Sequence, residues 1–135
     1  MKNNVTVFLI DNNEIDNFVH RKLLQKISDD INVLTFLSAT NALEYLKANK
    51  ILPQVILLNL HLPIYDGFQF LEYYEKLDIE KKNIDIFILS AIISPTDLQL
   101  IKQNTNCSGY IEKPLTTAKL SKLIEMKLSE LEVLR

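Results

Sequence analysis

The polar residues that could do chemistry in this chain stand at the ends of four short apolar runs. They are Asp11 and Asn12 in "IDNNE", Asn59 in "LNLHLPIYDG", Ser90 in "ILSA" and Lys113 in "YIEKP". Carboxylate and amide oxygens are ligands of hard cations such as magnesium, while lysine and hydroxyl groups bond to phosphoryl oxygens. These residue types would therefore suit ion and phosphoryl chemistry, provided that the fold brings the run ends together.

The apolar runs predict five strands, at residues 5–10, 31–37, 54–60, 84–90 and 108–111. They are rich in β-branched and aromatic residues and alternate with longer amphipathic stretches, which is the pattern of βα units. Three of them are almost continuously apolar, as expected of strands covered on both faces. We therefore predict an α/β fold with one doubly wound, five-stranded parallel sheet, helices on both faces and a functional site at the carboxyl ends of the strands.

Apolar residues at helical spacing predict the first two helices, and we interpret both stripes as core packing. The first stripe consists of Ile15, Phe18, Val19, Leu23 and Ile27. The second helix is expected behind Asn41, whose offset to Glu44 resembles a capping box, and carries Ala42, Leu43 and Leu46.

Three further helices are predicted in the same way. The third begins near Asp66 and the fourth after Pro95, which suits a first helical turn because proline lacks the N–H group. The last runs from Thr116 or Thr117 to the C-terminus. The apolar residues of the third helix are Phe68, Leu71 and Tyr74, and those of the last are Leu120, Leu123, Ile124, Leu128, Leu131 and Leu134.

Composition limits the classes of function. The 135 residues fit one domain, 1–135, with no separate output domain. A net charge of -2 provides no basic field, so we expect no direct nucleic-acid partner. No apolar stretch is long enough for a signal peptide or a membrane span, which predicts no membrane association. The lone Cys107 cannot form an internal disulfide and is expected to be an inert thiol of a cytoplasmic protein.

Together the motifs resemble the receiver domain of response regulators in two-component signalling, of the chemotaxis-regulator type, over essentially the whole chain. In that family two acidic residues follow the first strand, a phosphorylated aspartate ends the third, and Pro and then Asp-Gly follow it. Thr or Ser ends the fourth strand, and Lys-Pro follows the fifth. The resemblance implies the flavodoxin-like strand order 2-1-3-4-5 and a role in phosphorelay signal transduction.

Carried over by position, the family pattern assigns a role to each polar residue named above. Asp11 matches the first acidic position, Asn12 the second, Asn59 the phosphoacceptor, Ser90 the hydroxyl and Lys113 the lysine, with Pro63, Asp66, Gly67 and Pro114 completing the frame. Ser90 and Tyr110 also match the family's switch pair. Equally, Ser90 could simply end a strand beside a surface tyrosine, because sequence cannot show a two-state element.

The departures from the family pattern lie at Asn12 and Asn59, the two positions whose carboxylates would touch the metal. An amide is too weak a nucleophile to accept a phosphoryl group and brings no charge to a cation. A complete pocket has three carboxylates and one lysine, which matches a divalent ion, whereas Asp11 and Lys113 cancel one another. We therefore expect no enzymatic activity, no cofactor and weak magnesium binding if any.

These features predict a pseudo-receiver that acts through protein–protein interaction. The resemblance implies a histidine kinase or phosphotransfer protein as partner, docked on the fourth helix, fifth strand and last helix. The face of the first helix, with Phe18, His20 and Arg21, is the second expected surface.

Two alternatives stay open at this point. In the first, the chain is a conventional phosphorylated receiver in which Asn59 has been introduced in place of a natural aspartate. The second is a small flavodoxin-like cofactor binder, disfavoured because Gly67 and Gly109 are the only glycines. His61 is expected to face solvent, and Asp16 is interpreted as helix-start charge that favours the positive end of the helix dipole.

Overall fold

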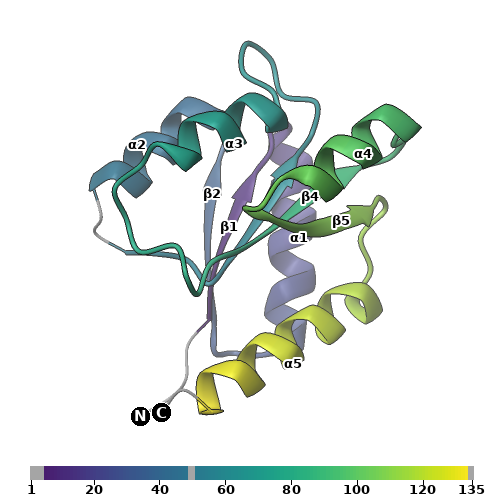
Figure 1. Ribbon diagram of the computed structural model, residues 1–135. Coiled ribbons are helices and arrows are strands. Elements are labelled where there is room, and N and C mark those ends of the chain that lie inside the picture. The colour runs from purple at the N-terminus through teal and green to yellow at the C-terminus, as the bar shows by residue number, and fades with distance from the viewer. Residues whose placement is uncertain (1–4, 49–50, 134–135) are drawn as a thin grey trace.

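The computed structural model describes residues 5–48 and 51–133, so residues 1–4, 49–50 and 134–135 of the predicted domain lie outside it. It contains five consecutive βα units (Figure 1). In chain order these are β1 (Val5–Ile10), α1 (Glu14–Ile27), β2 (Ile31–Phe36), α2 (Ala39–Ala48), β3 (Val55–Asn59), α3 (Gly67–Glu75), β4 (Asp85–Ser90), α4 (Pro95–Gln103), β5 (Cys107–Glu112) and α5 (Thr117–Val133).

The strands form one parallel sheet in the order β2-β1-β3-β4-β5, which confirms the predicted fold class. Every residue of β1 and β3 is buried, as their continuous apolar runs predicted. The observed strand ends differ from the predicted ones by one residue at most. Leu37 was assigned to the second strand but lies beyond its end and is exposed.

Helices cover both faces of the sheet. One core cluster joins Phe8, Ile56 and Ile88 to α2, α3 and α4, and a second joins Val7, Leu57 and other residues of the opposite face to α1 and α5. Figure 1 shows α1 and α5 together on one side of the sheet and α2 with α3 on the other. Within the described ranges no helix has the length and apolar character needed to cross a bilayer.

The predicted buried stripe of α1 is wrong over the first half of the helix. Ile15 is 72% exposed and Phe18 is 60% exposed, and Val19 also faces solvent. The buried residues of α1 are instead Asn17, His20 and Leu24, while Leu23 and Ile27 pack partly against the core. The physical reason is that α1 begins over the ends of two strands, where backbone carbonyls need a donor that an apolar side chain cannot supply.

Asn17 is that donor. Its amide nitrogen donates to the carbonyl oxygens of Asp11 at 3.0 Å and Phe36 at 3.4 Å. Asp11 directly follows β1, and Phe36 is the last residue of β2. Burial of a polar side chain is favourable where it satisfies buried backbone groups in this way. The polar face of α1 therefore turns inward at the level of the predicted site.

The starts of the other helices follow local capping. The expected start of the second helix at Asn41 is wrong, because α2 begins at Ala39 and the Ser38 hydroxyl accepts from the Asn41 N–H at 3.1 Å. The start of α3 after Asp66, α4 at Pro95 and α5 at Thr117 are as predicted. On α5 Leu120 and Ile124 are buried and Leu123 and Leu128 partly so, while Leu134 and the side chain of Leu131 lie outside the described part.

The start of α3 is fixed close to the end of β3. Asp66 and Gln69 form a reciprocal capping box, with donor–acceptor distances of 3.0 and 2.9 Å. The Gly67 N–H donates to the Leu60 carbonyl at 2.9 Å, and a Cβ on Gly67 would lie 3.2 Å from the Leu60 Cα. Any other residue would push the Leu60 backbone back by a few tenths of an ångström, so glycine favours the close approach of the "PIYDG" loop to the strand that carries Asn59.

Candidate functional site

The predicted polar residues meet at one edge of the sheet, at the carboxyl ends of four strands. Asn59 and Ser90 are the last residues of β3 and β4, Asp11 directly follows β1, and Lys113 directly follows β5. Since β1 and β3 are neighbours while β2 lies outside β1, the strand order reverses next to Asp11 and Asn59. This is the topological switch point at which doubly wound sheets bind their ligands.

Asp11 is the centre of the site and is almost fully buried. One carboxylate oxygen accepts the Asn13 N–H at 2.9 Å, and the other pairs with the Lys113 ammonium at 3.0 Å. The backbone N–H of Lys113 donates to the Ser90 carbonyl at 2.9 Å, which connects the end of β5 to the end of β4. The ion pair therefore bridges the first and last strands of the site across the strands between them.

Asn59 has its amide nitrogen turned toward two acceptors. The nitrogen lies 3.5 Å from a carboxylate oxygen of Asp11 and 3.3 Å from the carbonyl oxygen of His61. Like Asp11, Asn59 is buried, whereas the His61 side chain faces solvent as predicted. An aspartate in this position would present a second negative oxygen to Asp11, so the amide replaces a repulsion with a weak attraction.

Asp16 joins the site, which the sequence interpretation missed. Its carboxylate lies 3.3 Å from the Lys113 ammonium, which is therefore shared between Asp11 and Asp16. The predicted neutral balance is wrong for this reason, because two carboxylates now face one lysine. The sequence did show that Asp16 lies in the first turn of α1, next to Asn17. It did not show that this part of the helix faces Lys113.

His20 is a second buried polar residue that the sequence interpretation missed. It lies one helical turn after Asp16 and was expected to contribute to a docking surface, which its burial excludes. Burial, and then the positive charge of Lys113, lower the pKa of His20 below its usual value of 6.5, while the carboxylates of Asp16 and Asp11 act in the opposite direction. The buried imidazole therefore takes up a proton less readily than a free histidine does.

The comparisons with known proteins follow the same residues. A family model of the response regulator receiver domain matches residues 7–125, from β1 into α5. The chain belongs to the receiver domain family. The resemblance inferred from the motifs is thereby confirmed, and with it a place in two-component signalling.

Solved receiver structures have the same fold. A two-component response regulator from Legionella pneumophila is 29% identical with a TM-score of 0.79, and the match covers 93% of this chain and 98% of that chain. A receiver protein from Dyadobacter fermentans is 28% identical with a TM-score of 0.79, covering 91% and 97%. The sensor histidine kinase CheAY of Helicobacter pylori is 27% identical over 122 residues, which are 88% of this chain and only 14% of the kinase.

Ser90 and Tyr110, the residues predicted to form a switch pair, lie in different surroundings in this receiver. Ser90 is buried, and its hydroxyl donates to the Ile92 carbonyl at 2.6 Å while accepting the Ile92 N–H at 3.3 Å. Tyr110 is exposed on β5. Ser90 therefore shapes the loop after β4, and a switch between Ser90 and Tyr110 stays a prediction.

The donor set fits a magnesium ion poorly. Asp11 uses both carboxylate oxygens to accept from protein donors. The Lys113 ammonium occupies the place beside Asp11 where the attraction for a cation would be strongest. Asn12 is exposed, and Asn59 directs its nitrogen rather than its oxygen at Asp11. Among residues 5–48 and 51–133 no three His, Cys, Asp or Glu side chains gather closely enough to hold a metal. Weak magnesium binding stays a prediction.

Proposed function

We propose that this receiver accepts no phosphoryl group and signals by binding another protein of a two-component pathway. The observation that carries the proposal is the amide at the acceptor position. Asn59 offers no nucleophilic oxygen, and its nitrogen already lies against Asp11 and the His61 carbonyl. Phosphoryl transfer needs an attacking oxygen in line with phosphorus and cations to neutralise the transferred group.

The charges of the site support the same proposal. In a phosphorylated pocket the lysine would pair with the incoming phosphoryl oxygens, but here Lys113 already has Asp11 at 3.0 Å and Asp16 at 3.3 Å. Asp16 therefore supplies from within the chain the negative partner that a phosphoryl group would otherwise provide. A lysine held by two carboxylates of its own chain is less available to an incoming phosphoryl group.

The proposed partner is a histidine kinase or phosphotransfer protein, and the proposed surface is the exposed face of α1. Ile15, Phe18 and Val19 are large apolar residues that the fold leaves in solvent. Exposed apolar residues at neighbouring helical positions mark interaction sites. The partial match to a sensor histidine kinase supports a kinase pathway.

Ile64 supports an interaction role beside the site. It stands in the "PIYDG" loop with φ at +69°, a region that β-branched residues rarely occupy, and it is 89% exposed. The strained, exposed side chain is available for contact with a partner, which supports an interaction role for this loop.

A cytoplasmic location stays a prediction. Burial raises the pKa of the half-buried Cys107 thiol, in keeping with the inert thiol predicted.

The proposed partner and surface are tested by affinity purification from native extract with matched variants. Phe18→Asp on α1 should lose a histidine kinase or phosphotransfer protein that the unchanged protein retains. Met126→Asp on α5 is the control, since Met126 is 59% exposed, almost the same as Phe18. Equal retention by Phe18→Asp would refute the α1 surface. Loss with Met126→Asp alone would favour the α4, β5 and α5 surface, and enrichment of neither protein class would refute the proposed partner.

A further inference from the structure

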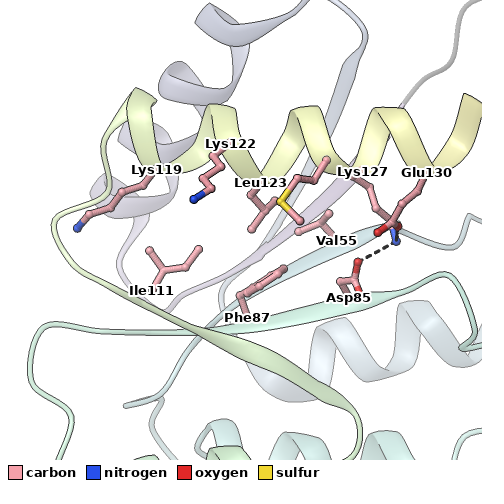
Figure 2. Close-up of a pocket in the computed structure, with 10 residues that line it drawn as sticks. Val55, Asp85, Phe87, Ile111, Lys119, Lys122, Leu123, Lys127 and Glu130 are labelled. Carbon is pink, nitrogen blue, oxygen red and sulfur yellow. Dashed lines mark hydrogen bonds and ion pairs between the residues drawn. The ribbon is translucent and has the colours of Figure 1, made fainter.

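A groove with a volume of about 220 Å³ runs between α5 and strands β3, β4 and β5 (Figure 2). Its floor consists of Val55, Phe87 and Ile111, which point toward the helix. On the side of the helix it is lined by Leu123 and Met126 of α5. The groove reaches the amino ends of β3 and β4, whereas Asn59 and Ser90 stand at their carboxyl ends. It is therefore a place in the fold separate from the pocket of Asp11 and Lys113.

The groove exists because two helices must cover this face of five strands. Within the described residues α5 packs against α1 and β1, which leaves β4 and β5 only partly covered. Phe87 and Ile111 are half-buried for this reason, although both are apolar and face the helix. The floor thus offers apolar surface that a ligand could remove from water.

One end of the groove is closed by a buried ion pair. The side chain of Lys127 is 5% exposed, and its ammonium lies 2.9 Å from Asp85 and 3.3 Å from Glu130. Both carboxylates therefore share one buried lysine. This end is therefore net negative and disfavours a ligand carboxylate.

The other end has positive charge without a carboxylate partner. Lys119 donates to the backbone carbonyl oxygens of Glu112 at 2.8 Å and Pro114 at 3.1 Å, so its charge is hydrogen-bonded but not neutralised. Lys122 is exposed and, within the described part of the chain, has no acceptor. The groove is thus apolar along its length and cationic at one end.

We propose that this groove binds a small amphiphilic carboxylate, with the carboxylate at Lys122 and the hydrocarbon body on Phe87, Ile111 and Met126. The volume is below the roughly 300 Å³ at which pockets for drug-sized ligands begin. A medium-chain fatty acid or a single-ring aromatic acid has the size and the charge that fit. Such a ligand would act on α5 and β5 without needing a phosphoacceptor, and the site does not depend on the function proposed above.

The test is an amide NMR titration of the whole protein with octanoate, octanol and octylamine as probes. Octanoate should give saturable shifts at Phe87, Ile111 and Leu123, and it should bind more tightly than octanol and much more tightly than octylamine. Lys122→Glu should weaken octanoate about three- to tenfold, because the charge reversal removes one attraction and adds one repulsion at an exposed site. Lys82→Glu, an exposed lysine of the loop before β4, is the matched control and should leave the affinity unchanged.

Three results would overturn the proposal. They are shifts that do not saturate in the millimolar range, octylamine binding as tightly as octanoate, or an equal loss with Lys122→Glu and Lys82→Glu. Sedimentation of the ligand-free protein gives an independent check. Self-association that Met126→Asp abolishes, in a protein that binds no octanoate, would show that a second copy of the chain covers the groove instead.

Discussion

Replacing Asn17 by alanine should destabilise the protein by about 2 kcal/mol, because an unsatisfied buried acceptor costs about 1–3 kcal/mol. The side chain is buried, and its amide nitrogen donates to the Asp11 carbonyl at 3.0 Å and to the Phe36 carbonyl at 3.4 Å. The Phe36 carbonyl keeps the Asp11 N–H at 3.0 Å, so its loss is small. The Asp11 backbone carbonyl loses its hydrogen bond from the Asn17 amide nitrogen. Among the described residues the Asn17 amide oxygen is buried without a hydrogen-bond donor, so its removal offsets part of this cost.

The assay is urea unfolding followed by circular dichroism. A slope of about 1–3 kcal/mol per molar urea places the expected midpoint shift near about 1 M. Asn12→Ala is the matched control, since Asn12 is an exposed asparagine of the loop just before α1 and should change stability by less than about 0.5 kcal/mol. Asn17→Leu separates the causes, because it refills the volume without restoring the donor. If Asn17→Ala matched Asn12→Ala, or if Asn17→Leu restored full stability, the hydrogen bonds would not be the reason for this burial.

Three further predictions concern the site. The Asn59→Asp variant should be phosphorylated slowly, and the Asn12→Asp variant not at all. The rate of phosphorylation of the double variant should exceed the product of the single effects, because nucleophile and metal act on one transition state. An Asn59→Asp variant that is phosphorylated as fast as the double variant would favour the alternative of a replaced natural aspartate. Millimolar magnesium should leave the melting temperature unchanged, because Asp11 and Asn59 already bond to protein groups, and a rise of several degrees would show that the site binds the ion. Because the pKa of His20 is lowered in the fold, its contribution to the free energy of unfolding should be complete above pH 6.5 and decrease as the pH drops below that value. His20→Gln should flatten this dependence in urea melts, whereas the exposed His61→Gln should not.

The strands and the strand-end residues could be predicted because they depend on local and topological rules. A continuous apolar run such as β3 must be covered on both faces, and parallel strands bring their carboxyl ends to one edge. Asp11, Asn59 and Lys113 therefore met as expected, although they are far apart in sequence.

The face of α1 could not be predicted, because helical periodicity shows which residues share a face but not what that face meets. Ile15, Phe18 and Val19 form a good apolar stripe, yet the fold turns Asn17 and His20 inward. The requirement that decided this, a donor for the carbonyls at the ends of β1 and β2, belongs to the tertiary structure. The role of Asp16 was missed for the same reason, since its distance to Lys113 depends on how α1 is rotated.

The start of α2 shows a smaller failure of the same kind. Asn41 and Glu44 have capping-box spacing, but Ser38 provides the cap and the helix starts at Ala39. Several residues near a helix start can satisfy the sequence pattern, and the path of the preceding strand decides among them.

The central claim is tested most directly by the intact mass of the protein after incubation with phosphoramidate or acetyl phosphate and millimolar magnesium. The account predicts an unchanged mass, because Asn59 offers no carboxylate and Lys113 is held by Asp11 and Asp16. The matched positive control is the double Asn12→Asp and Asn59→Asp variant under the same conditions. A phosphoryl adduct on the unchanged protein, located at or near residue 59, would contradict the account.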